Sequence, residues 1–85
     1  MPILKSDKGD YVIISCRYSI SYFDVCNNEF IIDSEMVNSP VYDFVISSKS
    51  ITTRMGNLSE KEKQGIIWRV NEICNNHNIK LLITE

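Results

Sequence analysis

The hydrophobic pattern of this chain changes its period once, just before Ser59, and that change limits the folds that the chain can adopt. Upstream, β-branched and aromatic residues gather in short runs, a composition typical of strands. Asn27-Asn28 tolerate the left-handed backbone of a turn, and Pro40 has no N–H for a strand ladder, so both positions interrupt the runs. We therefore predict strands at residues 11–16, 20–23, 30–33, 41–46 and 50–54.

Downstream of this change the sequence predicts one amphipathic helix. Ser59 and Glu62 have the spacing of a capping box, in which each side chain binds the backbone N–H of the other residue. The helix ends within residues 75–78, because asparagine accepts the left-handed conformation at a helix C-terminus. The apolar composition of residues 79–83 predicts a final strand after the helix. The apolar residues that share one face of the helix are Ile66, Ile67, Val70, Ile73 and Cys74.

These elements together predict an α+β fold. An antiparallel meander of four or five strands carries the helix on one face, and the C-terminal strand joins the sheet. The other face of the sheet stays in solvent or meets a partner. A chain of 85 residues has the length of a single domain, residues 1–85, and we expect residues 1–9 to be loosely held. Three widely spaced cysteines give no disulfide framework, so we expect free thiols, with Cys16 and Cys74 buried and Cys26 exposed.

The residue pattern of a catalytic or metal site does not occur in this sequence. His77 is the single histidine and lies at the predicted helix end, where a cation suits the helix dipole, so we interpret it as a capping residue. The cysteines and the histidine are too scattered for a zinc site, and the isolated glycines match no phosphate-binding motif. We therefore expect a protein that is not an enzyme and that holds no metal or cofactor.

The sequence also bears on location. No apolar run approaches the ~20 residues that a membrane span needs. The first ten residues lack the apolar segment of a secretion signal. We therefore expect a cytoplasmic protein that does not bind a membrane.

Acidic residues are concentrated in the middle of the chain. Between Tyr18 and Ser48 there is no Lys or Arg, and five acidic residues give this segment a charge of −5, whereas the whole chain carries −2. Neighbouring strands are expected to bring these acids into one region, whose field attracts a basic partner and repels nucleic acid. The same charges also suit a solvated sheet edge that resists strand pairing. Tyrosines, which are enriched in interfaces, lie among the acids.

Two further features of the helix invite interpretation. Trp68 lies beside the apolar face, and we expect it to cover the margin of the core, the alternative being an exposed anchor for a partner. Arg69 and Glu72 are three residues apart, which predicts an ordinary ion pair on the helix surface.

Four short motifs follow one another within residues 12–84: Ile32-Asp33-Ser34-Glu35, Tyr42-Asp43-Phe44-Val45-Ile46, Ser50-Ile51, and Leu58-Ser59-Glu60-Lys61-Glu62-Lys63 with Ile66-Ile67 behind it. In these motifs the chain resembles a family of small bacterial immunity proteins from polymorphic toxin systems, including contact-dependent growth inhibition. The resemblance implies that the protein is encoded beside a toxin and neutralises it by tight binding in the cytoplasm. Many of these toxins are nucleases with basic substrate clefts.

The resemblance and the charge pattern indicate the same partner, a basic toxin C-terminal domain, expected to be a nuclease, and no direct contact with nucleic acid. An acidic surface can occupy a basic cleft in place of phosphates. Two other classes stay open: a structural module that self-associates through an exposed strand edge, and a small regulatory domain that binds a metabolite or nucleic acid. We hypothesise that the toxin is bound by seven residues, namely Asp24, Glu29, Asp33, Glu35, Asp43, Tyr22 and Tyr42.

Overall fold

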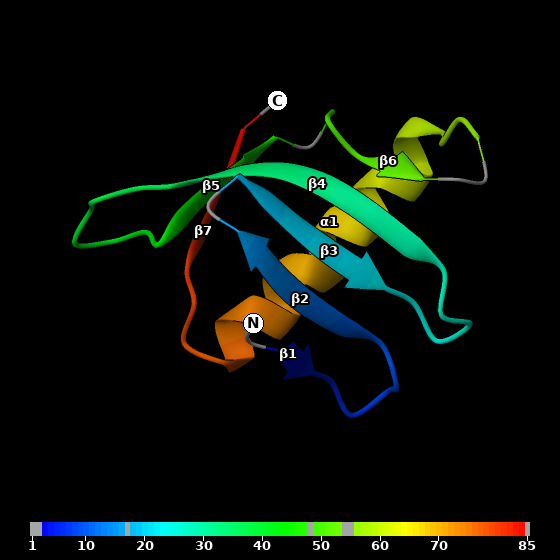
Figure 1. Cartoon of the computed structure of the whole chain (residues 1–85), viewed down its shortest axis with the longest axis horizontal. Coiled ribbons are helices and arrows are strands. Elements are labelled where there is room, and N and C mark those ends of the chain that lie inside the picture. Colours follow the sequence, from blue (N-terminus) through cyan, green and yellow to red (C-terminus); the bar gives the residue numbers. More distant parts are fainter. Residues whose placement is uncertain (1–2, 17, 48, 54–55, 85) are drawn as a thin grey trace.

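The computed structural model describes residues 3–16, 18–47, 49–53 and 56–84, which form one sheet with one helix across it (Figure 1). The prediction of an α+β fold with a helix on one face of a largely antiparallel sheet is confirmed. We call the face opposite the helix the outer face. The elements in chain order are β1 (Ile3–Lys5), β2 (Tyr11–Cys16), β3 (Ser19–Phe23), β4 (Glu29–Met36), β5 (Phe44–Ser47), β6 (Thr52–Thr53), α1 (Glu60–Asn76) and β7 (Leu81–Thr84).

The sheet is antiparallel except at one edge. Strands β2 to β5 lie side by side in chain order, as predicted for a meander, and β1 adds a strand that was not predicted. The predicted strand at residues 50–54 does not continue the meander beside β5. Strand β4 has two partners on one side, because β6 pairs with Phe30 and Ile31 near its start and β5 pairs with Ser34–Met36 at its end. After the helix, β7 joins the sheet, as predicted, although it spans Leu81–Thr84 rather than residues 79–83. It lies beside β5 and runs parallel to it. The helix supplies the long crossover that a parallel pair requires.

The N-terminal segment differs from its prediction. Instead of a loose end, residues 3–5 form β1, in which Leu4 lies opposite Val12 of β2. Leu4 is buried in the core beneath the helix. Burying a leucine side chain contributes roughly 1.5–3 kcal/mol, and the pairing of β1 with β2 adds to this in holding the segment in place.

Strand boundaries around β4 also differ from the predicted ones. Strand β4 extends to Met36, because its backbone pairs with β5 beyond the predicted end. Strand β5 begins at Phe44 rather than Val41, since the β4–β5 connection closes where the Val37 N–H donates to the Asp43 carbonyl (3.1 Å). Strand β6 has only two residues, and the predicted end of that strand at Arg54 lies outside the described residues.

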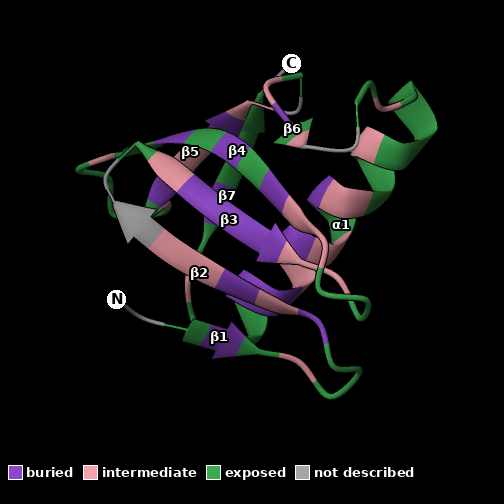
Figure 2. Ribbon diagram, turned by 45° about the vertical axis from the view of Figure 1, so that its right-hand side comes forward, coloured by how far each residue is buried: buried purple, intermediate pink, exposed green. Residues whose placement is uncertain are grey.

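The core lies between the sheet and the helix and contains every second residue of the central strands (Figure 2). In β4, Phe30 and Ile32 face the helix layer while Ile31 and Asp33 face outward. One-sided burial produces this period of two in a strand. The buried apolar side chains are Leu4, Val12, Ile20, Tyr22, Phe30, Ile32, Phe44, Ile46, Ile51, Ile67, Val70, Ile73, Cys74 and Leu81.

Both ends of the helix are capped as the sequence predicts. The Ser59 hydroxyl accepts a hydrogen bond from the Glu62 N–H (3.1 Å), and the Glu62 carboxylate accepts one from the Ser59 N–H (3.2 Å). At the other end His77 is the capping residue, and Asn78 takes the left-handed conformation with a φ of 64°. The predicted apolar face is buried except for Ile66, which is only partly covered.

The described cysteines lie where the sequence places them. Cys74 is buried in the core and Cys26 is exposed in the β3–β4 turn, and both are free thiols. Burial raises the pKa of the Cys74 thiol to about 12, so this group is an unreactive apolar side chain at neutral pH. The side chain of Cys16 lies outside the described part of the chain.

Candidate functional site

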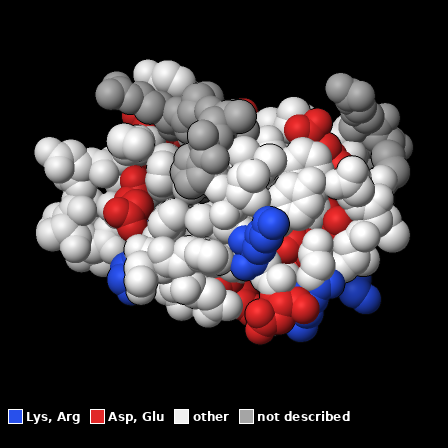
Figure 3. Space-filling model, turned by 60° about the horizontal axis from the view of Figure 1, so that its bottom comes forward, with Lys and Arg blue, Asp and Glu red and all other residues white. Residues whose placement is uncertain are grey.

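The five acidic residues of the hypothesised toxin-binding surface lie along β4 and its two connections. Glu29, Asp33 and Glu35 alternate along β4 and point to the outer face. Six residues separate Glu29 from Glu35, which is about 20 Å along a strand. Asp24 lies in the turn before β4, whereas Asp43 precedes β5 close to the far end of β4. The acids are therefore divided between the two ends of one strand, and Figure 3 shows acidic groups in several separate places on the face that it draws.

Asp24 is engaged in holding its own turn. Its carboxylate accepts hydrogen bonds from the N–H of Cys26 (3.0 Å), the N–H of Asn28 (2.9 Å) and the side-chain amide of Asn28 (3.1 Å). These bonds surround Asn27, whose left-handed φ of 66° confirms the predicted turn. Asp24 therefore has a structural role that leaves little of its carboxylate for a partner.

Tyr22 does not belong to an exposed surface. It occupies a helix-facing position of β3, is 6% exposed, and packs beside Phe30 in the core. Its hydroxyl donates to Asp10 Oδ2 (2.7 Å), and burial together with that carboxylate raises the pKa of Tyr22 to about 12. The structure therefore places Tyr22 in the core rather than on the exposed surface that was expected to carry it. Tyr42 is partly exposed in the connection before β5.

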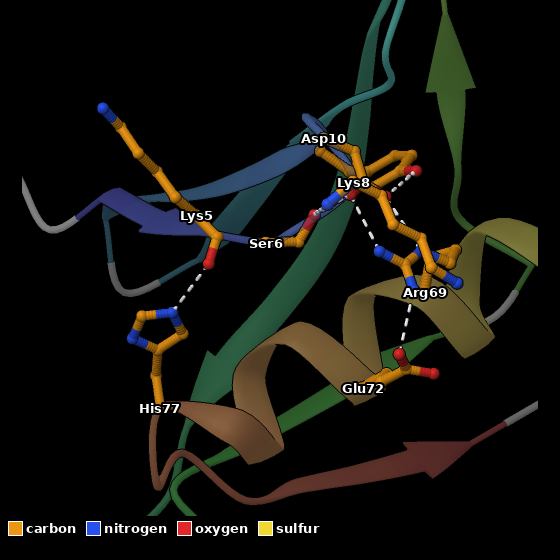
Figure 4. Close-up of polar contacts among 8 residues, drawn as sticks. Lys5, Ser6, Lys8, Asp10, Arg69, Glu72 and His77 are labelled. Carbon is orange, nitrogen blue, oxygen red and sulfur yellow. Dashed lines mark hydrogen bonds and ion pairs between the residues drawn. The ribbon is translucent and has the colours of Figure 1, made fainter.

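A buried charge cluster joins the helix to the sheet (Figure 4). Asp10, which is 3% exposed, lies just before β2 and accepts two hydrogen bonds from Arg69, through Nε and Nη2, each 2.8 Å long. The hydroxyls of Ser6 and Tyr22 also donate to this carboxylate. Arg69 Nη1 binds Glu72 at 2.9 Å. Five side chains therefore form one cluster: two come from the β1–β2 connection, one from β3 and two from α1.

Asp10 and Arg69 keep each other ionised. Hydrogen bonds from Arg69 hold the pKa of Asp10 well below its usual range, against the opposing effect of burial. The Asp10 carboxylate in turn raises the pKa of Arg69. Both groups are charged throughout the physiological range, so neither has the exchangeable proton that acid–base catalysis requires. We assign the cluster a structural role as an ionic bridge between the sheet and the helix.

Sequence reasoning missed the centre of this cluster. The predicted pair of Arg69 and Glu72 exists, but Arg69 is directed mainly at Asp10, which is 59 residues away in the chain. No local spacing indicates such a contact. The one available signal was the position of Arg69 directly before Val70, which is fully buried, since this places the arginine at the margin of the core.

Acidic and apolar side chains are exposed together at the far end of β4. Tyr18 and Met36 are 67% and 53% exposed, and with Glu35 they border a shallow hollow of about 400 Å³. The β4–β5 connection projects from the sheet next to this hollow and carries the exposed Val41 (Figure 1). We call the end of β4 with the adjoining β4–β5 connection the acidic corner and define it by Tyr18, Asp33, Glu35, Met36, Val41 and Asp43. Asp33 and Glu35 point to the outer face, whereas Met36 leaves β4 on the opposite side and meets Glu35 at the hollow.

Asp43 ties the acidic corner to the edge of the sheet. One of its carboxylate oxygens accepts a hydrogen bond from the Lys80 N–H (2.8 Å), and its own N–H donates to the Lys80 carbonyl (2.8 Å). This reciprocal contact fixes the end of the β4–β5 connection against the residue that precedes β7. The corner is therefore held by backbone hydrogen bonds at its base, which preserves its shape for binding.

Trp68 is 62% exposed, so the prediction that it covers the core margin is wrong. The helix turns about 100° between Ile67 and Trp68, and Ile67 is the residue that reaches the sheet. Trp68 instead borders a groove of about 500 Å³ between α1 and β7, together with Ile83 and the side chains of Lys49 and Lys63. An exposed tryptophan in a groove fits the alternative role of a partner anchor.

Within the described ranges, no group of three or more His, Cys, Asp and Glu side chains is placed to hold a metal ion. In the same part of the chain, no helix combines the length and apolar character that a bilayer crossing requires. Comparison of the chain with protein-family models, curated proteins and solved structures gives no significant match.

Proposed function

We propose that this chain is an immunity protein that binds a cognate bacterial toxin domain through the acidic corner and neutralises it in the cytoplasm. The observation that carries the proposal is the hollow at the end of β4, where the acidic Glu35 lies beside the exposed Tyr18 and Met36. Interfaces combine apolar anchors with polar rims, and an anionic surface accelerates encounter with a basic one. The similarity of the motifs in residues 12–84 to immunity proteins supports the same function.

The geometry of the corner suits a basic cleft. Asp33 and Glu35 are two residues apart on one face of β4, so their side chains lie about 7 Å apart and present two adjacent negative charges. Met36 and Tyr18 supply apolar area beside Glu35 at the hollow. A nuclease cleft lined by Lys and Arg would bind such a pair in place of phosphates. Asp33, Glu35 and Asp43 therefore remain in the proposed toxin contact, while Tyr22 is removed from it.

The first test is co-expression with the C-terminal domain encoded by the reading frame immediately upstream in the native operon. The proposal expects a stoichiometric complex on co-purification and survival of cells that otherwise die from the toxin domain. Recovery of the chain alone, with no rescue of growth, would refute the immunity function. In that case a ligand panel in a thermal-shift assay would test the regulatory class, since a bound ligand raises the melting temperature.

Charge reversals then locate the surface on the purified complex. Asp33→Lys and Glu35→Lys should each slow association and weaken binding, and the double reversal should do so by at least about tenfold at low salt. Asp7→Lys is the matched control, because Asp7 is an exposed acid in the β1–β2 connection and its reversal changes the net charge by the same amount. Equal effects from Asp7→Lys and Asp33→Lys would mean that net charge, rather than the acidic corner, governs binding.

A further inference from the structure

The outer face of the sheet carries two rows of side chains set by the strand register. In the first row the residues are Ile3, Ile13, Ser21, Ile31 and Thr52, on β1, β2, β3, β4 and β6. In the second row they are Lys5, Tyr11, Phe23 and Glu29, on β1 to β4. Ile3 and Ile31 are 52% and 40% exposed. A small domain therefore presents a largely apolar sheet face to its surroundings.

The second row has an ordered distribution of charge. Lys5 lies at one end and Glu29 at the other, three strands apart, which is about 14 Å. Tyr11 and Phe23 fill the middle, with their rings stacked at a centroid separation of 4.8 Å. Figure 4 shows the Lys5 side chain leaving β1 on the side away from His77 and the helix. The side chains of this row are therefore, in order, positive, aromatic, aromatic and negative. If a second copy of the row lies over it in the opposite order, each charge meets the opposite charge and each ring meets a ring.

We propose that two copies of this chain associate through their outer faces about a twofold axis that runs along the strands between β2 and β3. Such an axis reverses each row in the second copy. Lys5 then faces Glu29 of the second copy, and Tyr11 faces Phe23 of the second copy, with each contact made twice. Isologous contacts of this kind are the rule in symmetric dimers, and apolar sheet faces pack about 10 Å apart in sandwiches.

The first row fits the same axis. Ile3 faces Ile31 of the second copy, which joins the two exposed isoleucines. Ile13 faces Ser21 of the second copy, and Ser21 is a small side chain, 6% exposed, between the larger Ile13 and Ile31 of its own sheet. The small serine therefore adds no bulk between the two isoleucines of its own sheet, and Ile13 of the second copy packs over this position. A twofold axis that instead runs across the strands, over the second row, would place each strand over the same strand of the second copy and Lys5 over Lys5 of the second copy.

The contact leaves most of the acidic corner accessible. Glu35 is four residues beyond Ile31 along β4, a distance of about 13 Å, whereas Asp33 is two residues beyond Ile31 on the same face, about 7 Å away, and lies at the margin of the contact. The dimer does not require the proposed toxin contact, and each can fail without the other, because Lys5 and Glu29 probe the dimer while Glu35 probes the toxin contact. Four strands span only about 19 Å, so the buried area is small for a specific interface and the association is expected to be weak.

Sedimentation velocity across a concentration series tests the proposal, with circular dichroism to check folding. The wild-type chain should shift from monomer to dimer as concentration rises. Lys5→Glu and Glu29→Lys should each weaken the dimer by roughly tenfold, because each creates two like-charge contacts. An equimolar mixture of these two variants should regain the wild-type dissociation constant within about twofold, since each heterodimer restores both opposite-charge contacts. A mixture no tighter than its components would overturn the assigned symmetry.

Replacement of either of two exposed isoleucines by aspartate provides a matched control. Ile31→Asp should abolish the dimer, whereas Ile83→Asp should leave it intact, because Ile83 has nearly the same exposure, 39%, but borders the groove beside α1. Equal loss of association in both variants, or a wild-type chain that stays monomeric at every concentration, would overturn the proposal.

Discussion

Replacing Asp10 with alanine is expected to remove about 3–5 kcal/mol from the free energy of unfolding, because it breaks a buried ion pair and leaves the partner charge uncompensated. Arg69 would lose both of its 2.8 Å hydrogen bonds to this carboxylate, and the Tyr22 hydroxyl would lose its acceptor in the core. A chain of 85 residues has about 4–13 kcal/mol of stability in total. The variant should therefore melt roughly 12–40 °C below the wild type, or fail to fold.

A double-mutant cycle measures the part of this loss that belongs to the pair. Urea unfolding of Asp10→Ala, Arg69→Met and the double variant should show that the double costs at least about 1 kcal/mol less than the sum of the singles. Arg69→Met keeps the apolar stem against the core and removes the charge. A loss below about 1 kcal/mol for Asp10→Ala would refute the assignment of the cluster as an ionic bridge. Additive single effects would refute the pairing itself.

The stability that the Asp10–Arg69 pair contributes is expected to depend on pH. Folding lowers the pKa of Asp10 through its hydrogen bonds with Arg69. The resulting stability is fully present above the pKa of an unfolded aspartate, about 3.9, and is lost as pH falls toward the folded value. Asp10→Asn cannot titrate, so its deficit in stability relative to the wild type should shrink as pH falls from about 5 to 2. Thermal melts at each pH test this, and a deficit that stays constant would contradict the assigned cause.

Three further substitutions or labels probe the helix and the turns. Ser59→Ala should cost about 1 kcal/mol in urea unfolding, because it removes the acceptor for the Glu62 N–H; no change would show that the cap contributes nothing. Trp68→Ala should cost less than about 1 kcal/mol, and iodide should quench the fluorescence of Trp68 in the folded wild type, because this side chain is largely exposed; a shielded fluorophore would contradict its position. A maleimide should label Cys26 in the folded chain and Cys74 only after unfolding, as mass spectrometry of the labelled peptides would show.

The helix was the most predictable part of this protein, because its signals are local. A capping box needs only residues three apart, and an apolar face follows from positions three and four apart. Ser59, Glu62 and the left-handed Asn78 therefore lie as the sequence indicates. The strands were predictable as runs but less so in their limits. Met36 and Phe44 become strand ends through the pairing of β4 with β5, and that pairing involves residues that the local pattern does not connect.

The hypothesised site was predictable in composition and less so in geometry. The sequence alone establishes that five acids and no Lys or Arg occur between Tyr18 and Ser48. It does not establish that Asp24 binds its own turn while Asp33 and Glu35 point outward from one strand. Those differences arise from the strand register and from turn hydrogen bonds.

The sequence by itself determined the class of fold, the helix with its caps and the acidic character of the middle segment, because each depends on neighbours in the chain. Only the tertiary structure decided that Tyr22 is buried, that Trp68 is exposed and that Asp10 binds Arg69. Each of these outcomes depends on which face of one element lies against another, and such contacts join residues tens of positions apart. A tyrosine or an arginine can serve a core margin or a surface equally well, and packing rather than local pattern chooses between them.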